Sequence, residues 1–186
     1  MPINLKGLAI GDGWTDPPTL LHYSEWALQV GLIDPETATV IHNFEEDARK
    51  NWEQKNYIAY AESASEAYQI LTKHAKVNTY NYLLNPANVS APAETFLNKP
   101  EIQNALHVKK MEYVLYNKNV HNWLKDDLYY SVKPWLEELL EHYGVMCYNG
   151  QLDMIVAYAL SVHTHRSLKW SGAQEYQNAD RVPLYD

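Results

Sequence analysis

Two short apolar segments, one near each end of the chain, constrain the fold more than any other feature. Residues 4–10 (NLKGLAI) run into a Gly-Asp-Gly turn, and residues 145–148 (VMCY) run into an Asn-Gly turn. A short apolar run that is bounded by glycine turns is typical of a buried strand. Because a helical pattern follows each turn and further helices lie between the strands, the sequence predicts an α/β architecture with a helical insertion.

The helical pattern is densest in residues 19–76, which we expect to form a unit distinct from the first strand. Apolar residues at three- and four-residue spacing predict three helices there, over about 19–31, 35–48 and 56–74. Asp34 and Pro35 mark the start of the second helix, because they supply an N-cap and a proline at the first helical position.

Sequence features on either side of this block limit where helices form. Pro17 and Pro18 precede it and are expected to prevent both strand and helix. After the block, helical patterns return over three segments: 93–108 with a break at Lys99-Pro100, 131–140, and 153–168.

Composition excludes several classes of partner. The net charge is −8, from 15 Lys+Arg and 23 Asp+Glu, and no basic cluster is present, so nucleic acids and anionic membranes are not expected partners. The longest apolar run, residues 154–160, is far shorter than the ~20 residues of a membrane span. Tyrosine is abundant at 15 residues, and such amphipathic side chains suit a binding cleft.

Asp153 is the first candidate for chemistry. It follows the second predicted strand and its turn, which places a carboxylate at the carboxyl edge of a parallel sheet, where α/β folds bind ligands. An acid at the start of a helix is also favoured simply as an N-cap or by the helix dipole. The residues alone leave both interpretations open.

Four segments occur in an order that points to a known family. They are NLKGLAIGDG with TDP (4–17), KPEIQNALHV (99–108), VKPWL (132–136) and YNGQLDMIV (148–156), followed by the tail KWSGAQEY (169–176). Together they resemble the serine carboxypeptidase family, and within it the vitellogenic-carboxypeptidase-like branch. Asp12 stands where the wider family commonly has Asn, and it suits this branch.

The resemblance implies a partial α/β-hydrolase fold with an inserted helical cap. Residues 1–18 would form a core strand and turn of the hydrolase domain, residues 19–92 the cap and a loop, and residues 93–186 the return to the core with the acid-bearing unit. The family removes C-terminal residues from peptides or proteins with a Ser–Asp–His triad, and it needs no cofactor or metal.

Three residues acquire roles by the same resemblance. Asp153 would be the triad acid, accepting a hydrogen bond from the histidine and stabilising the imidazolium. Ile155 and Val156 match positions that line the pocket for the substrate side chain, although both would equally suit an ordinary helix core.

The other two triad members are not found in the chain. None of the eight serines has glycine both two residues before and two residues after it, as the nucleophile elbow requires. His163 and His165 are the only histidines after Asp153. On a continuous helix His163 would lie about 15 Å from Asp153, and two histidines two residues apart make a poor metal pair.

We expect His107 to be structural. The other histidines, which we expect to be solvated surface residues, are His22, His42, His74, His121 and His142.

The family's triad order places the elbow before Asn4 and the histidine beyond Asp186. We therefore expect a fragment that is inactive as an isolated chain. The alternative is a non-catalytic peptide-binding or interaction module built on the cap.

The expected compartment also follows the resemblance, which implies a secreted or lysosomal glycoprotein. Asn88 begins the sequon Asn-Val-Ser in a proline-flanked loop, so it is a candidate glycosylation site. The single cysteine, Cys147, allows no intramolecular disulfide, and the first residues do not resemble a signal peptide. Neither the single cysteine nor the first residues support secretion. The sequence also leaves the oligomeric state open.

Overall fold

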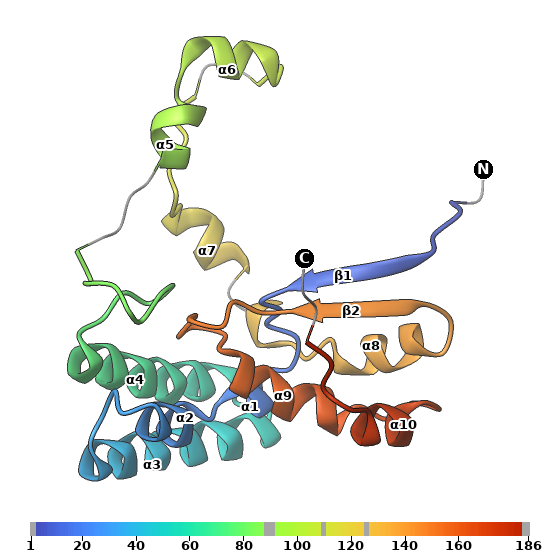
Figure 1. The fold of residues 1–186 in the computed structure, drawn as a ribbon. Coiled ribbons are helices and arrows are strands. Elements are labelled where there is room, and N and C mark those ends of the chain that lie inside the picture. Colours follow the sequence, from blue (N-terminus) through green and yellow to red (C-terminus); the bar gives the residue numbers. More distant parts are fainter. Residues whose placement is uncertain (1–2, 88–91, 109–110, 125–126, 184–186) are drawn as a thin grey trace.

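The computed structural model describes residues 3–87, 92–108, 111–124 and 127–183. Strands β1 (Gly7–Gly11) and β2 (Gly144–Tyr148) pair in parallel, with Gly7 opposite Gly144. Figure 1 shows the two strands side by side above a layer of helices. The predicted α/β architecture is therefore confirmed. The first strand begins at Gly7, three residues later than predicted, because only residues from Gly7 onward have a partner on β2.

Four helices form the layer that follows β1. They are α1 (Pro17–Leu20), α2 (Tyr23–Gln29), α3 (Pro35–Glu53) and α4 (Tyr57–Ala75). The predicted start of α3 is confirmed, since Asp34 Oδ1 accepts a hydrogen bond from the Thr37 N–H at 2.7 Å. The α4 helix ends where Lys76 adopts a left-handed conformation, with φ of 51°. No residue of this block forms a regular strand within the described range.

Three predictions of helix position are wrong. Pro17 begins α1 rather than preventing a helix, because the first turn of a helix does not use the missing N–H. The predicted helix over 153–168 begins only at Tyr158, as α9 (Tyr158–Ser167). The predicted helix over 19–31 is also interrupted between α1 and α2.

The core lies mainly within the helical layer and against the acid-bearing segment. Its buried apolar members are Leu20, Leu21, Tyr23, Trp26, Ala27, Ile33, Ala38, Ile41, Ala48, Tyr60, Ala67, Leu71, Met154, Val156, Ala157 and Leu160. Because residues 154–160 contribute to this core, the segment that follows β2 is fixed against α2 and α4 rather than held by the sheet alone.

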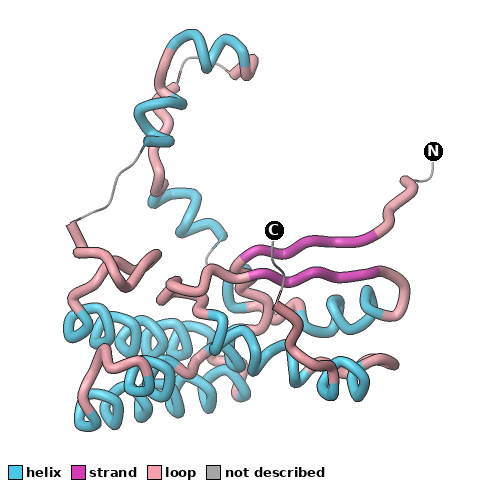
Figure 2. Tube along the Cα trace, in the orientation of Figure 1, coloured by secondary structure: helices cyan, strands magenta, loops and turns pink. Residues whose placement is uncertain are grey.

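The remaining helices fall into two groups. Helices α5 (Pro92–Leu97), α6 (Pro100–Ala105) and α7 (Lys118–Leu124) project away from the body of the molecule (Figures 1 and 2). The predicted break at Lys99-Pro100 separates α5 from α6. The short 3₁₀ helix η1 (Asp127–Tyr129) leads back to α8 (Lys133–Leu140), and α10 (Ala173–Asn178) follows α9.

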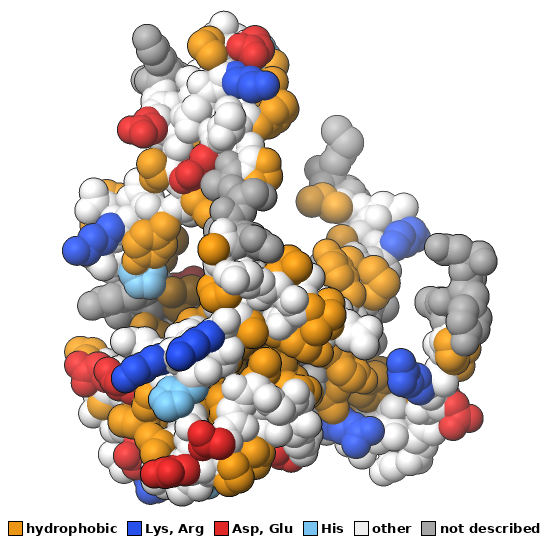
Figure 3. All heavy atoms as spheres, turned by 60° about the vertical axis from the view of Figure 1, so that its left-hand side comes forward, with side chains coloured by type: hydrophobic (Ala, Val, Ile, Leu, Met, Phe, Trp, Pro, Cys, Tyr) orange, Lys and Arg blue, Asp and Glu red, His pale blue; other side chains and the backbone are white. Residues whose placement is uncertain are grey.

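Much apolar surface is exposed on the projecting arm and on the sheet. Trp123 on the arm is 78% exposed and Met146 on β2 is 59% exposed. Figure 3 shows apolar side chains at the surface of both the arm and the body beside it. Within the described residues, no helix is long and apolar enough to cross a membrane.

Candidate functional site

Asp153 lies in a tight turn between β2 and α9. Its Oδ1 accepts a hydrogen bond from the Ile155 N–H at 3.1 Å, and its Oδ2 accepts one from the Val156 N–H at 2.9 Å. The side chain is 9% exposed. Because the carboxylate binds amides of its own turn, and Ala157 is the N-cap of α9, Asp153 does not cap that helix. These two bonds offset part of the cost of burying a charge.

The ends of both strands hold this turn. Asp12, which follows β1 with φ of 46°, accepts a hydrogen bond from the Gly150 N–H at 3.0 Å through its Oδ1. Asn149, directly after β2, donates from Nδ2 to the Val156 carbonyl and to Ser161 Oγ, each at 3.0 Å. The acid-bearing turn therefore sits at the carboxyl edge of the sheet, as the sequence predicted.

The helical layer fixes the turn from the other side. The Met154 N–H donates to the Thr79 carbonyl at 2.9 Å, in the loop that follows α4. The Tyr23 hydroxyl on α2 donates to the Ile155 carbonyl at 2.9 Å. The turn thus bridges the sheet and the helices, and its backbone is held on both sides.

A cavity of about 330 Å³ lies where this turn meets α2 and α4. Its walls are formed by Trp14, Leu21, Tyr23, Tyr60, Ala61, Ala64, Ser65, Tyr68, Leu128, Tyr129 and Ile155. The lining is mainly aromatic and aliphatic, which is the usual character of a pocket for an apolar ligand group. Two signals in the sequence pointed to this pocket: the abundance of tyrosine, and the resemblance that assigned Ile155 to a pocket wall.

The tyrosines of the cavity remain protonated in the physiological range. Burial is the main cause that raises the pKa of Tyr23, Tyr60 and Tyr68 above the ordinary value. The Tyr60 hydroxyl is buried, and it has no hydrogen-bond partner within the part of the chain that the structure describes. It is therefore a buried polar group in a lining that also includes Ser65, Tyr23 and Tyr68.

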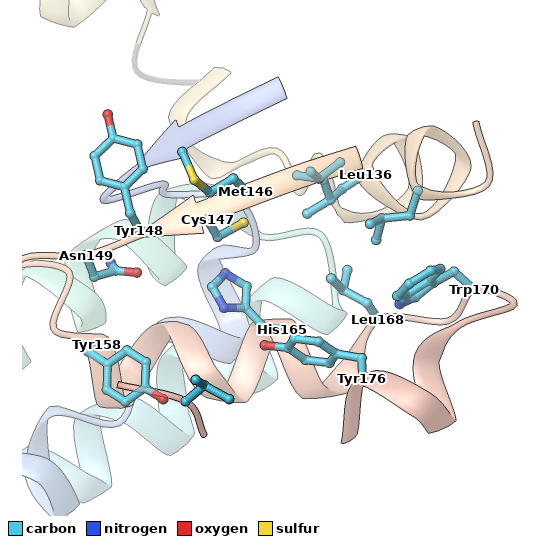
Figure 4. A pocket seen from close by; sticks show the side chains of 13 residues that line it. Leu136, Met146, Cys147, Tyr148, Asn149, Tyr158, His165, Leu168, Trp170 and Tyr176 are labelled. Atoms are coloured by element: carbon cyan, nitrogen blue, oxygen red, sulfur yellow. The ribbon is translucent and has the colours of Figure 1, made fainter. Parts of the chain in front are cut away.

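A larger cavity, of about 760 Å³, lies between β2 and helices α8–α10 (Figure 4). Leu136, Leu168 and Trp170 give it an apolar wall, and His165 points from α9 towards β2. Burial lowers the pKa of His165 and raises that of the Cys147 thiol, so both groups are neutral near pH 7. Asp153 lines neither cavity, but Ile155 of its turn lines the smaller one, so the smaller cavity is the better candidate for chemistry.

The structure brings some of the sequence-predicted site residues together and separates others. Ile155 lines the aromatic cavity beside the turn that holds Asp153. Val156 is 7% exposed and its side chain packs in the core. Asn88 lies outside the described residues. Within those residues, no histidine forms a hydrogen bond with the Asp153 carboxylate.

One histidine prediction is wrong. His22 is not an isolated solvated residue: it is half-buried, and its ring stacks on that of His163 with the centroids 3.9 Å apart. The pair joins α9 to the residue just before α2, and these positions are distant in the sequence. Residue spacing gives no signal for such a contact.

Comparison with known proteins finds serine carboxypeptidases by family model, by sequence and by structure. The family model described as serine carboxypeptidase matches residues 1–183. The venom serine carboxypeptidase of Apis mellifera is 33% identical over 190 residues, covering 96% of this chain and 41% of that protein. The probable serine carboxypeptidase CPVL of Homo sapiens is 34% identical, covering 96% and 40%. The vitellogenic carboxypeptidase of Aedes aegypti is 32% identical, covering 96% and 41%.

The chain thus spans about two fifths of the length of these relatives. Among solved structures, Kex1(delta)p, a prohormone-processing carboxypeptidase from Saccharomyces cerevisiae, superimposes with a TM-score of 0.71 at 23% identity. The match covers 91% of this chain and 41% of that protein. The likeness is one of fold, and it identifies the parallel strand pair and its helices as part of an α/β-hydrolase fold.

Proposed function

Because the chain belongs to the serine carboxypeptidase family, we propose that it forms the acid-bearing part of a serine-type carboxypeptidase, with Asp153 as the triad acid. The observation that carries this proposal is the buried Asp153 carboxylate, which two backbone amides orient beside an aromatic cavity. Any substrate of the whole protein would be the C-terminus of a peptide or protein.

The hydrogen bonds of Asp153 suit the role of a triad acid. An ionised carboxylate offers about four acceptor positions, and the two amides occupy two of them. Capacity remains for the N–H of a histidine supplied by another part of the protein. Such a bond would fix the tautomer of the imidazole and stabilise the imidazolium that forms during acyl transfer.

The aromatic cavity would receive a substrate side chain next to the scissile bond. Ile155 supports this assignment, because it belongs to the turn of Asp153 and also lines the cavity. The apolar walls favour an aliphatic or aromatic side chain over a charged one. Val156 would support the wall of the cavity without lining it, since its side chain lies in the core.

The decisive experiment uses a longer protein that contains this segment together with the nucleophile and the histidine. There, Asp153→Asn should lower kcat by about 10⁴ while KM changes little, by analogy with other triad acids. Asp12→Asn is the matched control, because an asparagine oxygen can still accept from the Gly150 N–H. A fall of less than tenfold for Asp153→Asn, or equal falls for both variants, would reject the assignment.

The 186-residue chain gives a second test of the proposal. We expect no hydrolysis of blocked dipeptides, since none of its serines has the flanking glycines of a nucleophile elbow. The chain should still bind a dipeptide with an apolar side chain, measured by tryptophan fluorescence through Trp14. Ala64→Trp should block that binding by filling the cavity, whereas Asp153→Asn should leave it.

We further propose a secreted or lysosomal location with glycosylation at Asn88. The support comes from the sequon in the sequence and from a relative named as a venom enzyme. Expression through a secretory pathway should give a product whose mass falls on treatment with an N-glycosidase. Asn88→Gln should abolish that shift, and a product of unmodified mass would contradict the proposal.

A further inference from the structure

Three potential metal ligands from two separate parts of the chain meet on the outer side of α2. His22 directly precedes α2, Glu25 lies in its first turn, and His163 lies on α9. One ligand atom from each residue lies within 4.8 Å of the others. The three residues line a hollow of about 40 Å³, together with Trp26, Gln29 and Leu160.

The residue types select the class of ion. Two imidazoles and one carboxylate form a nitrogen and oxygen set that suits Zn²⁺ and neighbouring transition metals, whereas Ca²⁺ and Mg²⁺ prefer oxygen ligands alone. A site with three protein ligands leaves a fourth position for water. Since Glu25 and His163 are exposed and the hollow is open, that position faces solvent.

The imidazole nitrogens are also available as ligands. Neither imidazole has a hydrogen-bond partner within the described residues. The charge of Arg49, the cation near His22, is partly neutralised by an ion pair with Glu46.

The present side-chain positions require a small adjustment. Ligands of a tetrahedral Zn²⁺ lie about 3.4 Å apart, given Zn–N distances near 2.0–2.1 Å. The ligand atoms lie within 4.8 Å of one another, so any contraction that the ion requires is at most about 1.4 Å. The two rings are almost parallel, at 14°, and an ion cannot lie in the planes of both until one ring tilts. His163 is exposed, so its ring can rotate out of the stack without disturbing the core.

From this arrangement we infer that His22, Glu25 and His163 bind one Zn²⁺-type ion that clamps α2 to α9. The consequence would reach the candidate active site. Leu21 and Tyr23, which flank His22, both line the aromatic cavity. An ion bound through His22, on the opposite side of this segment, would hold Leu21 and Tyr23 in place as part of the cavity wall. The inference does not depend on the proposed catalytic role, because the ligands contact neither Asp153 nor the cavity.

The experiment titrates the 186-residue chain with ZnCl₂ in a calorimeter and with CoCl₂ in a visible-absorption assay. We expect one ion per chain, a cobalt spectrum of low coordination number, and no heat with CaCl₂ or MgCl₂. Saturating Zn²⁺ should also raise the melting temperature, because an ion that binds only the folded state stabilises it.

Three substitutions locate the site. His22→Ala, His163→Ala and Glu25→Gln should each weaken Zn²⁺ binding at least tenfold and reduce the thermal shift. His142→Ala is the matched control, because His142, just beyond the end of α8, forms an exposed pair with Glu138 at 3.5 Å. Glu25 and His163 are exposed, so their variants should fold even if His22→Ala does not.

Two results would overturn the inference. One is an absence of Zn²⁺ binding by the folded chain. The other is Zn²⁺ binding that His163→Ala and Glu25→Gln leave unchanged, or that His142→Ala weakens to the same extent. Circular dichroism of each variant distinguishes loss of a ligand from loss of the fold.

Discussion

The helical layer α1–α4 and the strand pair β1–β2 differ in where their side chains lie. The helices supply most of the fully buried apolar residues, including Leu20, Ile41 and Leu71 at 0% exposure. No residue of either strand is fully buried; exposed and half-buried positions alternate along both. The helical layer therefore contributes most of the buried core, whereas the turn that holds Asp153 begins at the strand pair.

Backbone hydrogen bonding explains this difference. A helix satisfies its own amides and carbonyls, so α3 and α4 need only pack against each other. A parallel strand depends on neighbours, and parallel sheets are normally covered on both faces. Within the described residues the sheet has two strands, and its exposed face includes Met146 and Tyr148. Helix α8 and the turn contacts of Asp12 and Asn149 support it.

The largest effect should come from truncating the helical core. Leu71→Ala removes a fully buried side chain from α4 and should destabilise the fold by about 2–5 kcal/mol. Met146→Ala on β2, where the side chain is 59% exposed, should change stability by no more than about 0.5 kcal/mol. Urea denaturation followed by circular dichroism measures both. Similar values for the two variants would remove the contrast between the regions.

An intermediate effect is expected from a methyl group placed between the strands. A Cβ on Gly7 would lie 2.7 Å from the carbonyl oxygen of Gly144, so Gly7→Ala should weaken strand pairing by about 1–3 kcal/mol. Gly144→Ala is the matched control, because a Cβ there meets nothing within 4 Å.

Hydrogen exchange measured by mass spectrometry locates this effect. Gly7→Ala should speed exchange in β2 and leave α3 and α4 unchanged, whereas Gly144→Ala should change neither. Faster exchange in the helices of the Gly7 variant would show that the two regions unfold together, contrary to the comparison.

The smallest effect concerns the pH dependence of the helical layer. Glu45 is 1% exposed and accepts hydrogen bonds from the Ser24 N–H and hydroxyl, at 3.0 and 2.6 Å. Burial nevertheless raises the pKa of Glu45 in the folded state. The folded protein therefore retains this proton to higher pH than the unfolded chain, and the stability from it falls as pH rises above about 4.5.

Glu45→Gln removes this titration and keeps a side chain that can bond Ser24. The melting temperature of the protein that retains Glu45 minus that of the variant should be larger at pH 4.5 than at pH 7.5. The subtraction cancels the titration of groups that do not contact Glu45, and both proteins carry His42→Gln because His42 Nδ1 lies 3.9 Å from Glu45 Oε2. A difference that is constant with pH, or that grows towards pH 7.5, would show that the folded state does not raise the pKa of Glu45.

Features set by neighbouring residues were predictable from the sequence. The start of α3 followed from Asp34 and Pro35, and β2 followed from an apolar run before an Asn-Gly turn. The start of α9 was wrong because the carbonyls of Ile155 and Val156 accept hydrogen bonds from the Tyr23 hydroxyl and from Asn149 Nδ2, which hold this segment in a turn where a helix would use those carbonyls itself. A helical pattern does not reveal this competition.

Features formed by distant residues were not predictable. The aromatic cavity combines residues from α2, α4, η1 and the turn of Asp153, and no spacing rule joins them. The stacking of His22 on His163 depends on how α2 packs against α9. The role of Asp153 could be suggested in advance because the ordered segments resemble a family, which supplies information that spacing does not contain.

The pairing of β1 with β2 has a consequence for the order of events during synthesis. Asp12 and Asn149, at the ends of the two strands, are 137 positions apart. A ribosome that adds about 5–20 residues per second needs roughly 7–27 s to cover that interval. Helices α3 and α4 can form within it, since helix formation takes about a microsecond. Strand β1 is thus made well before β2, and the small residues Gly7, Ala9 and Gly11 reduce its tendency to pair with other chains during that interval.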